Sequence, residues 1–303
     1  MNDVQLFAVS HDGPVRLSAA DPLRSIYDLP DTLPYGVYTV FRTFEHHKFL
    51  SLADHLDRIE LSIELLEWRY RPDRQAIRRA LHEVCTAYPL PNARVRLDVL
   101  AAPAEQLGTE SRELITLSPF EPVPDACYRD GVHVGVARRL QRPQPRAKTA
   151  DFVLIRRNYP VGRPDAFEHL LLSEDGRILE GSGSNFYAIR GGVLWTAGDG
   201  VLEGITRKIV LRLAPLLEIP VRLEAVALSD VPRLDEAFMS GSSRGLIPIV
   251  SIDGETVGDG RPGPVTRRLM AAYDAYVAQT IRPAIGAENV SAAGEKDGRP
   301  ERS

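Results

Sequence analysis

The feature of this 303-residue chain that most constrains its fold is a run of strand and helix patterns that stops at a proline-rich segment. Residues 36–44 are rich in β-branched and aromatic types, which favours a strand. Apolar residues at helical spacing predict helices over 51–69 and 73–87. Alternating segments at 93–101 and 113–117 predict two further strands. Together they indicate a two-layer α/β unit.

The proline-rich segment suggests how the chain is divided. Residues 119–130 carry three prolines, and we interpret them as a linker between an N-terminal α/β domain, 1–118, and a C-terminal domain, 131–283. The last segment, 284–303, is small and polar and is expected to be a disordered tail. The second domain mixes both element types. Its expected elements are strands near 131–137, 168–172, 185–189 and 236–240, a helix from about 205, and a helix over 264–281.

Composition excludes several classes of function. No stretch approaches the roughly 20 apolar residues of a membrane span, and residues 1–17 lack the pattern of a secretory signal, so a cytoplasmic location is expected. Acidic and basic residues are interspersed with a net charge of −4, which argues against nucleic acid as a partner. The two cysteines form no CxxC pair and the histidines lack metal-site spacing, so no metal is expected.

Lysine is scarce, which narrows the choice of an amine nucleophile. Only four of the 37 cationic residues are lysines: Lys48, Lys148, Lys208 and Lys296. Lys148 lies between a proline-rich loop, 141–147, and the apolar FVLI run. Burial there favours the neutral amine, the form that Schiff-base chemistry requires. The alternative is an ordinary exposed loop lysine.

Three other segments stand out, and the last two of them offer groups that can bind an anion. Arg58 follows His55 by three residues and projects from the same side of the first helix. Residues 203–207 (EGITR) read as a turn that opens a helix, whose free N–H groups attract anions. Residues 240–245 (SGSSRG) form a small turn rich in hydroxyls. Taken alone, each segment is more simply explained as a solvated helix face, a helix cap or a plain turn.

Several motifs occur in an order that resembles a known family. The segments are HLDRIELS, GRILEGSGSNFYAI, EGITRKIV, MSGSSRGLIPIVSIDG and GDGRPGPVTRRL. From about residue 30 to 280 the chain resembles the class IV aminotransferases, the pyridoxal 5′-phosphate (PLP) enzymes of fold type IV. Their members include branched-chain, D-amino-acid and (R)-amine aminotransferases and aminodeoxychorismate lyase. The resemblance implies two α/β domains, the smaller one N-terminal, with the cofactor between them, and a homodimer.

The resemblance also implies a role for each matching residue. Lys148 should bind PLP covalently and move the proton during catalysis, and Glu180 should pair with the pyridine nitrogen. The phosphate should be held by Arg58, the Ile205 and Thr206 amides and Ser242. Ser243 and Arg244 occupy the turn that faces the substrate carboxylate in amino-acid-specific members. Tyr35 and Phe41 match positions that often wall the substrate pocket.

The chain departs from the family pattern at three places. Val153 stands where many branched-chain members carry a tyrosine bonded to the phenolic oxygen of the cofactor. The 35–44 segment is atypical, with Arg42 where an acidic residue is usual. Arg244 replaces a small residue. The two added arginines suggest a dicarboxylate substrate such as 2-oxoglutarate.

The predicted function is therefore a PLP-dependent transaminase. It would move an amino group between an aliphatic, branched-chain type amino acid and a 2-oxo acid such as 2-oxoglutarate. The alternatives are a D-amino-acid or (R)-amine transaminase, a lyase of the aminodeoxychorismate type, and a relative that no longer turns over. The same lysine and glutamate serve the transaminase and the lyase, so the motifs leave both open.

Overall fold

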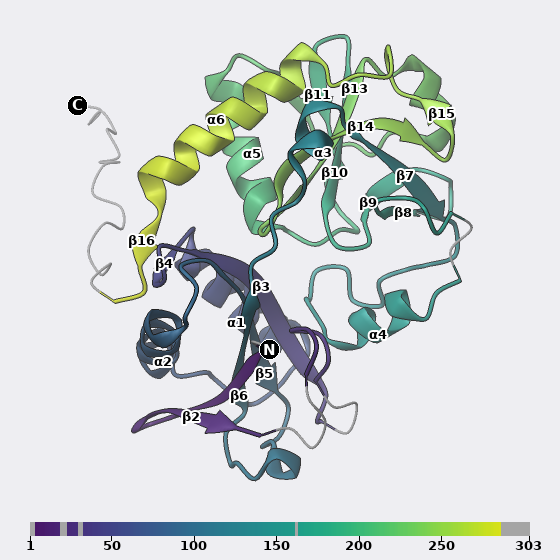
Figure 1. Ribbon diagram of the computed structural model, residues 1–303. Coiled ribbons are helices and arrows are strands. Elements are labelled where there is room, and N and C mark those ends of the chain that lie inside the picture. Colours follow the sequence, from purple (N-terminus) through teal and green to yellow (C-terminus); the bar gives the residue numbers. More distant parts are fainter. Residues whose placement is uncertain (1–3, 19–22, 30–32, 161–162, 286–303) are drawn as a thin grey trace, which may run out of the picture.

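The computed structural model has two β-sheets at opposite ends of the molecule (Figure 1). The chain passes from the first sheet to the second near residue 120 and returns to the first at its C-terminal end. The residues that the structure describes are 4–18, 23–29, 33–160 and 163–285.

The first sheet has seven strands, and every pairing in it is antiparallel. Two helices pack against it, α1 (Leu52–Leu65) and α2 (Arg74–Ala87), and their apolar faces enclose one hydrophobic core. In order across the sheet the strands are β16 (Arg282–Pro283), β4 (Lys48–Phe49), β3 (Gly36–Phe44), β5 (Ala93–Leu100), β6 (Glu113–Pro119), β1 (Gln5–Ser10) and β2 (Gly13–Leu17).

The helix and strand patterns of the N-terminal half are found with small changes. Strand β3 has the expected bounds, and the Asp73 carboxylate caps α2 by accepting from two backbone N–H groups of the first turn. Helix α1 ends at Leu65, four residues before the expected end. The chain turns there because Glu67 takes a left-handed conformation with φ of 57°, which a helix cannot continue.

The second sheet is mixed and has nine strands. Asn185 on β10 pairs with Glu180 on β9, so six strands form a closed circuit of neighbours. In order the strands are β12 (Val221–Arg222), β11 (Val193–Trp195), β10 (Asn185–Arg190), β13 (Glu236–Gly241), β14 (Gly245–Ile252), β7 (Val132–Ala137), β8 (His169–Leu172) and β9 (Ile178–Gly181), with β15 (Glu255–Thr256) beside β14.

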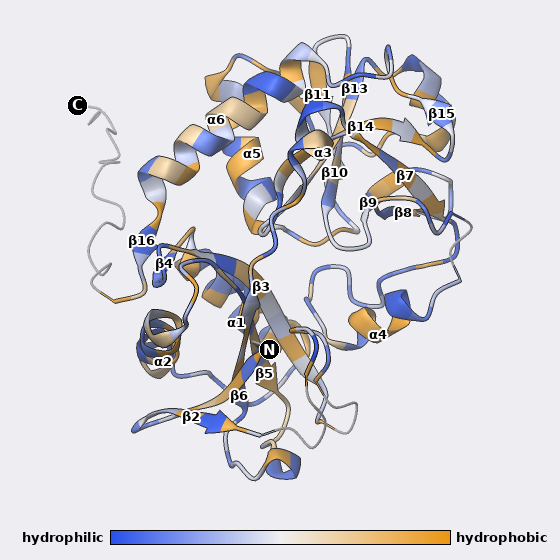
Figure 2. Cartoon of the chain, viewed as in Figure 1, coloured by the Kyte–Doolittle hydropathy of each residue, from blue (hydrophilic) through white to orange (hydrophobic). Residues whose placement is uncertain are grey.

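Two long helices cover the second sheet. Their buried residues form a core with β10 and β13, while orange and blue residues alternate along the outer length of α6 (Figure 2). No helix in the described part of the chain is both long and apolar enough to cross a membrane. The helices of this half are α3 (Asp125–Arg129), α4 (Asp151–Arg157), α5 (Ile205–Leu216) and α6 (Pro264–Thr280). Short 3₁₀ turns lie at Glu105–Leu107 in the first half and at Leu228–Arg233 in the second.

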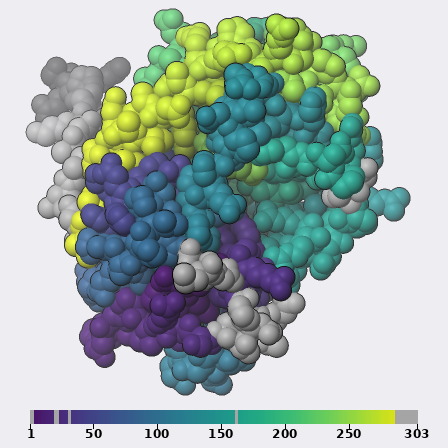
Figure 3. All heavy atoms as spheres, in the orientation of Figure 1, coloured from purple at the N-terminus to yellow at the C-terminus, as the bar shows by residue number. Residues whose placement is uncertain are grey.

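The structure departs from the expected interdomain linker and from the expected C-terminal tail. The 119–130 stretch contains helix α3, which packs on β14. Strand β16 pairs with β4, so the end of the expected C-terminal domain belongs to the first sheet. Ala284, expected to begin the tail, is buried, and its carbonyl accepts from Arg78. Figure 3 shows the C-terminal segment, in yellow, lying along the purple and blue N-terminal half. Residues 286–303 lie outside the described residues.

Candidate active site

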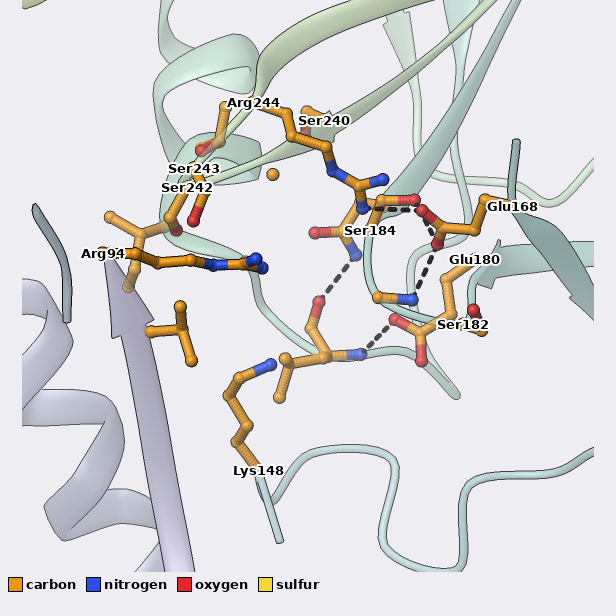
Figure 4. Close-up of a pocket in the computed structure, with 18 of the residues that line it drawn as sticks. Arg94, Lys148, Glu168, Glu180, Ser182, Ser184, Ser240, Ser242, Ser243 and Arg244 are labelled. Carbon is orange, nitrogen blue, oxygen red and sulfur yellow. Dashed lines mark hydrogen bonds and ion pairs between the residues drawn. The ribbon is translucent and has the colours of Figure 1, made fainter. Parts of the chain in front are cut away.

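A cavity of about 410 Å³ is lined by residues of both sheets, and it contains Lys148 and Glu180 (Figure 4). The first half of the chain contributes side chains from β3, α1 and β5. The second half contributes the residues around β9, the start of α5 and the turn after β13. The six residues expected to bind the cofactor and two of the four expected to bind the substrate therefore line one cavity: Arg58, Lys148, Glu180, Ile205, Thr206 and Ser242, with Ser243 and Arg244.

The backbone of Lys148 is attached to the edge of β3. Its carbonyl accepts from the Tyr38 N–H at 2.9 Å, and its own N–H donates to Ser62 Oγ at 3.1 Å. The adjacent Thr149 forms an isolated bridge with Val37. These bonds hold the lysine where its side chain enters the cavity, and Nζ lies 4.8 Å from the centre of the Tyr38 ring.

The surroundings of Lys148 favour its neutral amine. Burial lowers its pKa well below the ordinary value for lysine, and the nearby positive charges of Arg58, Arg142 and Arg156 lower it further. Among the interactions that shift this pKa, the carboxylate of Glu180 acts in the opposite direction. An unprotonated amine is a nucleophile and a base, so Lys148 can attack a carbonyl carbon and can accept a proton.

Glu180 is fully engaged by the protein. Its Oε1 accepts from Arg142 Nε at 2.9 Å and its Oε2 accepts from the Leu202 N–H at 3.1 Å. Burial raises the pKa of this carboxyl group, and Arg142 opposes that rise. Arg142 is itself buried, with its guanidinium 4.1 Å from the centre of the Phe152 ring. The result is a carboxylate with a fixed orientation at the cavity wall.

Glu180 and Asn185 bind the same residue, and this explains the spacing of the motif around them. While Leu202 donates to Glu180, its carbonyl accepts from Asn185 Nδ2 at 2.8 Å. Gly204 follows, and a Cβ there would lie 2.1 Å from Asn185 Oδ1. Glycine is therefore required where this loop passes β10 and enters α5. The Ile205 and Thr206 N–H groups open the helix beside the cavity.

Arg58 belongs to a buried chain of hydrogen bonds. Its Nη2 donates to Thr39 Oγ1 at 2.7 Å, and the same hydroxyl lies 2.6 Å from His55 Nδ1. Burial, with the Arg58 charge next in size, holds the pKa of His55 well below its usual value, so the imidazole is neutral. Thr39 accepts from the arginine and can donate its own proton to Nδ1. Burial lowers the pKa of Arg58 to about 10, which leaves it charged at neutral pH.

The turn after β13 is tied to the rest of the wall by Arg244. Its guanidinium donates to Glu168 Oε2 at 2.6 Å. The other oxygen of Glu168 accepts from the Gly183 N–H at 2.7 Å and from Ser184 Oγ at 2.9 Å. Figure 4 shows this pair on the opposite side of the cavity from Ser242 and Ser243. The charge that Arg244 adds is therefore offset by a carboxylate of the protein itself.

The structure corrects the expected walls of the substrate pocket. Phe41 is 3% exposed and packs in the core of the first sheet, and Tyr35 is 40% exposed beside a separate surface cavity. Side chains alternate along a strand, so Phe41 faces α1 while Tyr38 and Val40 face the cavity. Arg42 lies on a neighbouring cavity and stacks on Phe120, with its guanidinium 3.8 Å from the ring centre.

Sequence reasoning missed several residues that line or organise the cavity, among them Tyr38, Thr39, Arg94 and Arg142. The alternation in 36–44 carried the signal for Tyr38, because it has the opposite parity to Phe41, whereas Thr39 has the same parity as Phe41 and faces α1. Val153, at the position of the expected tyrosine, is buried against Tyr38 and Val40. No cluster of metal-ligating side chains occurs within the described ranges.

A family model, amino-transferase class IV, matches residues 36–252. The chain belongs to the class IV aminotransferases. Among curated class IV relatives, a probable branched-chain-amino-acid aminotransferase of Thermotoga maritima is 32% identical over 196 residues, which are 59% of this chain and 70% of that protein. A D-alanine aminotransferase of Staphylococcus haemolyticus is 38% identical over 102 residues, 33% of this chain and 36% of that one.

Solved structures of branched-chain amino acid aminotransferases share the fold. The crystal structure of a putative branched-chain amino acid aminotransferase from Thermotoga maritima has a TM-score of 0.73 at 25% identity, covering 91% of this chain and 96% of that one. The branched-chain amino acid aminotransferase from Thermobaculum terrenum, solved in its PLP form, has a TM-score of 0.69 at 24% identity, covering 82% and 89%.

The comparisons confirm the main predictions. This class IV aminotransferase is a PLP-dependent enzyme with the expected α/β fold, and it acts on an amino acid and a 2-oxo acid.

Proposed function

We propose that this enzyme transfers an amino group between an aliphatic L-amino acid of the branched-chain type and a 2-oxo acid such as 2-oxoglutarate. The proposal is carried by the meeting of Lys148 and Glu180 in one cavity lined by both halves of the chain. The likeness to branched-chain aminotransferases supports the choice of amino acid, and the D-alanine aminotransferase relative makes a D-amino acid the second candidate.

The residues of the cavity fit PLP. The Nε of Arg58 is buried without a hydrogen-bond partner in the described part of the chain, so it can serve an external anion. The N–H groups that open α5 and the Ser242 hydroxyl complete a phosphate site, since helix N-termini bind phosphate. The Glu180 carboxylate can accept a hydrogen bond from the protonated pyridine nitrogen, and the neutral amine of Lys148 can bind the aldehyde carbon.

Each side chain around the cavity would have a separate role in the proposed transamination. PLP, when bound, supplies the electron sink that lets the proton on the substrate α-carbon leave. Lys148 Nζ would act as the base that accepts this proton and donates it again. Glu180 would pair with the protonated pyridine nitrogen, and Arg142 keeps Glu180 ionised and oriented. Arg58, held by Thr39, would bind the phosphate and so fix the position of the cofactor.

We also propose a homodimer in the cytoplasm. The exposed apolar side chains of Tyr35 and Leu154 gather at the rim of a surface cavity that shares Tyr27 with the active cavity, which suits a subunit interface. The free thiols of Cys85 and Cys127 suit a reducing compartment. Light scattering after size-exclusion chromatography measures the molar mass of the protein in solution. The mass of a single chain would contradict the dimer.

The decisive experiment records the absorbance spectrum of the cofactor and, in the same reaction, measures transfer of the amino group to the 2-oxo acid. The PLP-loaded enzyme is mixed with L-leucine or with D-alanine, and with 2-oxoglutarate, and the formation of glutamate is measured by mass spectrometry. The proposal is supported if L-leucine causes rapid loss of the absorbance of the lysine-bound cofactor and formation of L-glutamate. Activity with D-alanine alone moves the enzyme to the second candidate. Release of pyruvate from aminodeoxychorismate, without amino transfer to an acceptor, selects the lyase.

Two lysine variants control this experiment. Lys148→Ala should abolish both the protein-bound chromophore and turnover. Lys208→Ala, which removes a lysine whose side chain is 46% exposed, should change neither. A Lys148→Ala protein that keeps the chromophore would overturn the assignment of the lysine.

A further inference from the structure

Arg94 places a positive charge in the active cavity without a carboxylate partner. It projects from β5 and lines the cavity, and Figure 4 shows its guanidinium pointing into the open space. Its Nη2 donates to the Tyr27 hydroxyl at 3.1 Å. Its Nε is buried without a hydrogen-bond partner, and no ion pair to Arg94 occurs within the described ranges. A buried donor left in this state costs stability unless a ligand satisfies it.

Three other guanidinium groups of the cavity are paired with a carboxylate or face the site proposed for the phosphate. Arg142 is paired with Glu180 and Arg244 with Glu168. Arg58 faces the part of the cavity proposed for the cofactor phosphate. Arg156, like Arg94, has no ion pair among the described residues, but its Nη1 donates to the Ser182 carbonyl at 3.0 Å and it has no buried nitrogen without a partner. Arg94 therefore combines an unbalanced charge with a buried N–H group that has no hydrogen-bond partner in the described part of the chain.

The position of Arg94 in the sheet makes its isolation costly. Its direct partner across the β3–β5 pairing is Arg42, so two like charges stand opposite each other. Such a cross-strand pair is destabilising. Two residues along the strand, Arg96 shows the alternative, because it makes a buried ion pair with Asp98 at 2.6 Å. Strand β5 therefore neutralises Arg96 with a carboxylate of its own, Asp98, and provides none for Arg94.

We propose that Arg94 binds the distal carboxylate of a dicarboxylic substrate, and so determines specificity for the 2-oxoglutarate and glutamate class. This inference rests on the proposed transamination. A guanidinium offers two parallel N–H groups that match a carboxylate, which gives both affinity and orientation. It also replaces the expectation that Arg42 and Arg244 select such a substrate, because Arg42 lies outside this cavity and Arg244 is already paired.

The distal carboxylate is assigned to Arg94 because the cavity offers another place for the α-carboxylate. Ser243 lies in the turn after β13, next to the Ser242 hydroxyl proposed for the phosphate, and this turn is on the side of the cavity where Arg94 lies (Figure 4). The α-carbon must stay beside Lys148 Nζ for proton transfer. A carboxylate on that turn leaves a second one, further along the substrate, for the guanidinium of Arg94.

The test compares two acceptors in Arg94→Gln and in a matched control, Arg42→Gln. The acceptors are 2-oxoglutarate and 4-methyl-2-oxopentanoate, which differ in the distal carboxylate. We expect Arg94→Gln to raise the KM for 2-oxoglutarate by about 10- to 100-fold, the size of a lost charge-assisted hydrogen bond. The KM for 4-methyl-2-oxopentanoate should change less than about threefold, and Arg42→Gln should leave both values near those of the native enzyme.

A binding measurement separates this inference from the proposed function. Calorimetry with glutarate and with 4-methylpentanoate needs no turnover, and glutarate affinity should fall in Arg94→Gln alone. Equal losses for both acceptors would assign Arg94 to the α-carboxylate and overturn the inference, as would unchanged glutarate affinity. Loss of the Lys148-bound chromophore in the native protein would instead overturn the proposed function, while the glutarate result still decides the role of Arg94.

Discussion

Arg142 Nε donates to Glu180 Oε1 at 2.9 Å, and the side chains of both residues are almost completely buried, at 4% and 2% exposed. The carboxylate expected at the pyridine nitrogen is thus already bound to a cation before any ligand enters. Without that cation, burial alone would drive the carboxyl group towards its neutral form, since burial raises its pKa. Arg142 therefore provides a physical reason for an ionised carboxylate in a dry part of the cavity.

The buried pair should be costly to break from either side. We expect Arg142→Gln and Glu180→Gln each to lower the free energy of unfolding by about 3–5 kcal/mol, because each leaves one buried charge uncompensated. Urea unfolding of the apo-protein measures this. The double variant should lose less than the sum of the two single losses. Strictly additive losses would show that the two side chains do not depend on each other.

Thr39 should matter for cofactor affinity although it does not line the cavity. Thr39→Val removes the hydroxyl that holds Arg58 Nη2 and lies against His55. We expect the Kd for PLP to rise by about tenfold, the effect of one hydrogen bond to a charged group. Titration of the apo-protein with PLP, followed by absorbance, measures it. Thr39→Ser keeps the hydroxyl and should bind PLP as the native protein does; if both variants weaken equally, the hydroxyl is not the cause.

Lys148 should destabilise the apo-protein at neutral pH. Its pKa in the folded state lies below the unfolded value of 10.5, so the unfolded chain binds more protons, and stability rises with pH through the interval between the two values. Lys148→Met removes this titration. We expect the variant to be more stable than the native apo-protein near neutrality, with the difference shrinking as the pH approaches 10.5. A difference that stays constant with pH would contradict the lowered pKa.

The two cysteines should differ in reactivity. Burial raises the pKa of Cys85 to about 12, so it carries almost no thiolate at neutral pH, and the side chain is 1% exposed. Cys127 is partly exposed on α3. Brief treatment of the native protein with iodoacetamide, followed by peptide mass spectrometry, should label Cys127 and leave Cys85 unmodified. Labelling of both should appear only after unfolding, and early labelling of Cys85 would show that the α2 core opens.

The four long helices and the motifs of the site were predictable because their signals are local, whereas the short helices α3 and α4 were not expected. Asp73 caps α2, and apolar spacing marked both N-terminal helices and α6. The Glu180 to Asn185 spacing is local in the sequence, although Leu202, which both residues bind, lies 22 residues from Glu180 and 17 from Asn185. Phe41 was misplaced for a local reason as well, because a shift of one residue along a strand reverses the face of every side chain.

The sequence by itself determined the family, the scarce lysine at position 148 and the residues of the anion-binding turns, because each depends on residue types at short spacing. Only the tertiary structure decided which charges are balanced. Arg244 meets Glu168 from 76 residues away and Arg142 meets Glu180 from 38, while Arg94 meets no carboxylate in the described part of the chain. Ion pairing depends on distances in space between distant segments, and sequence order does not encode those distances locally.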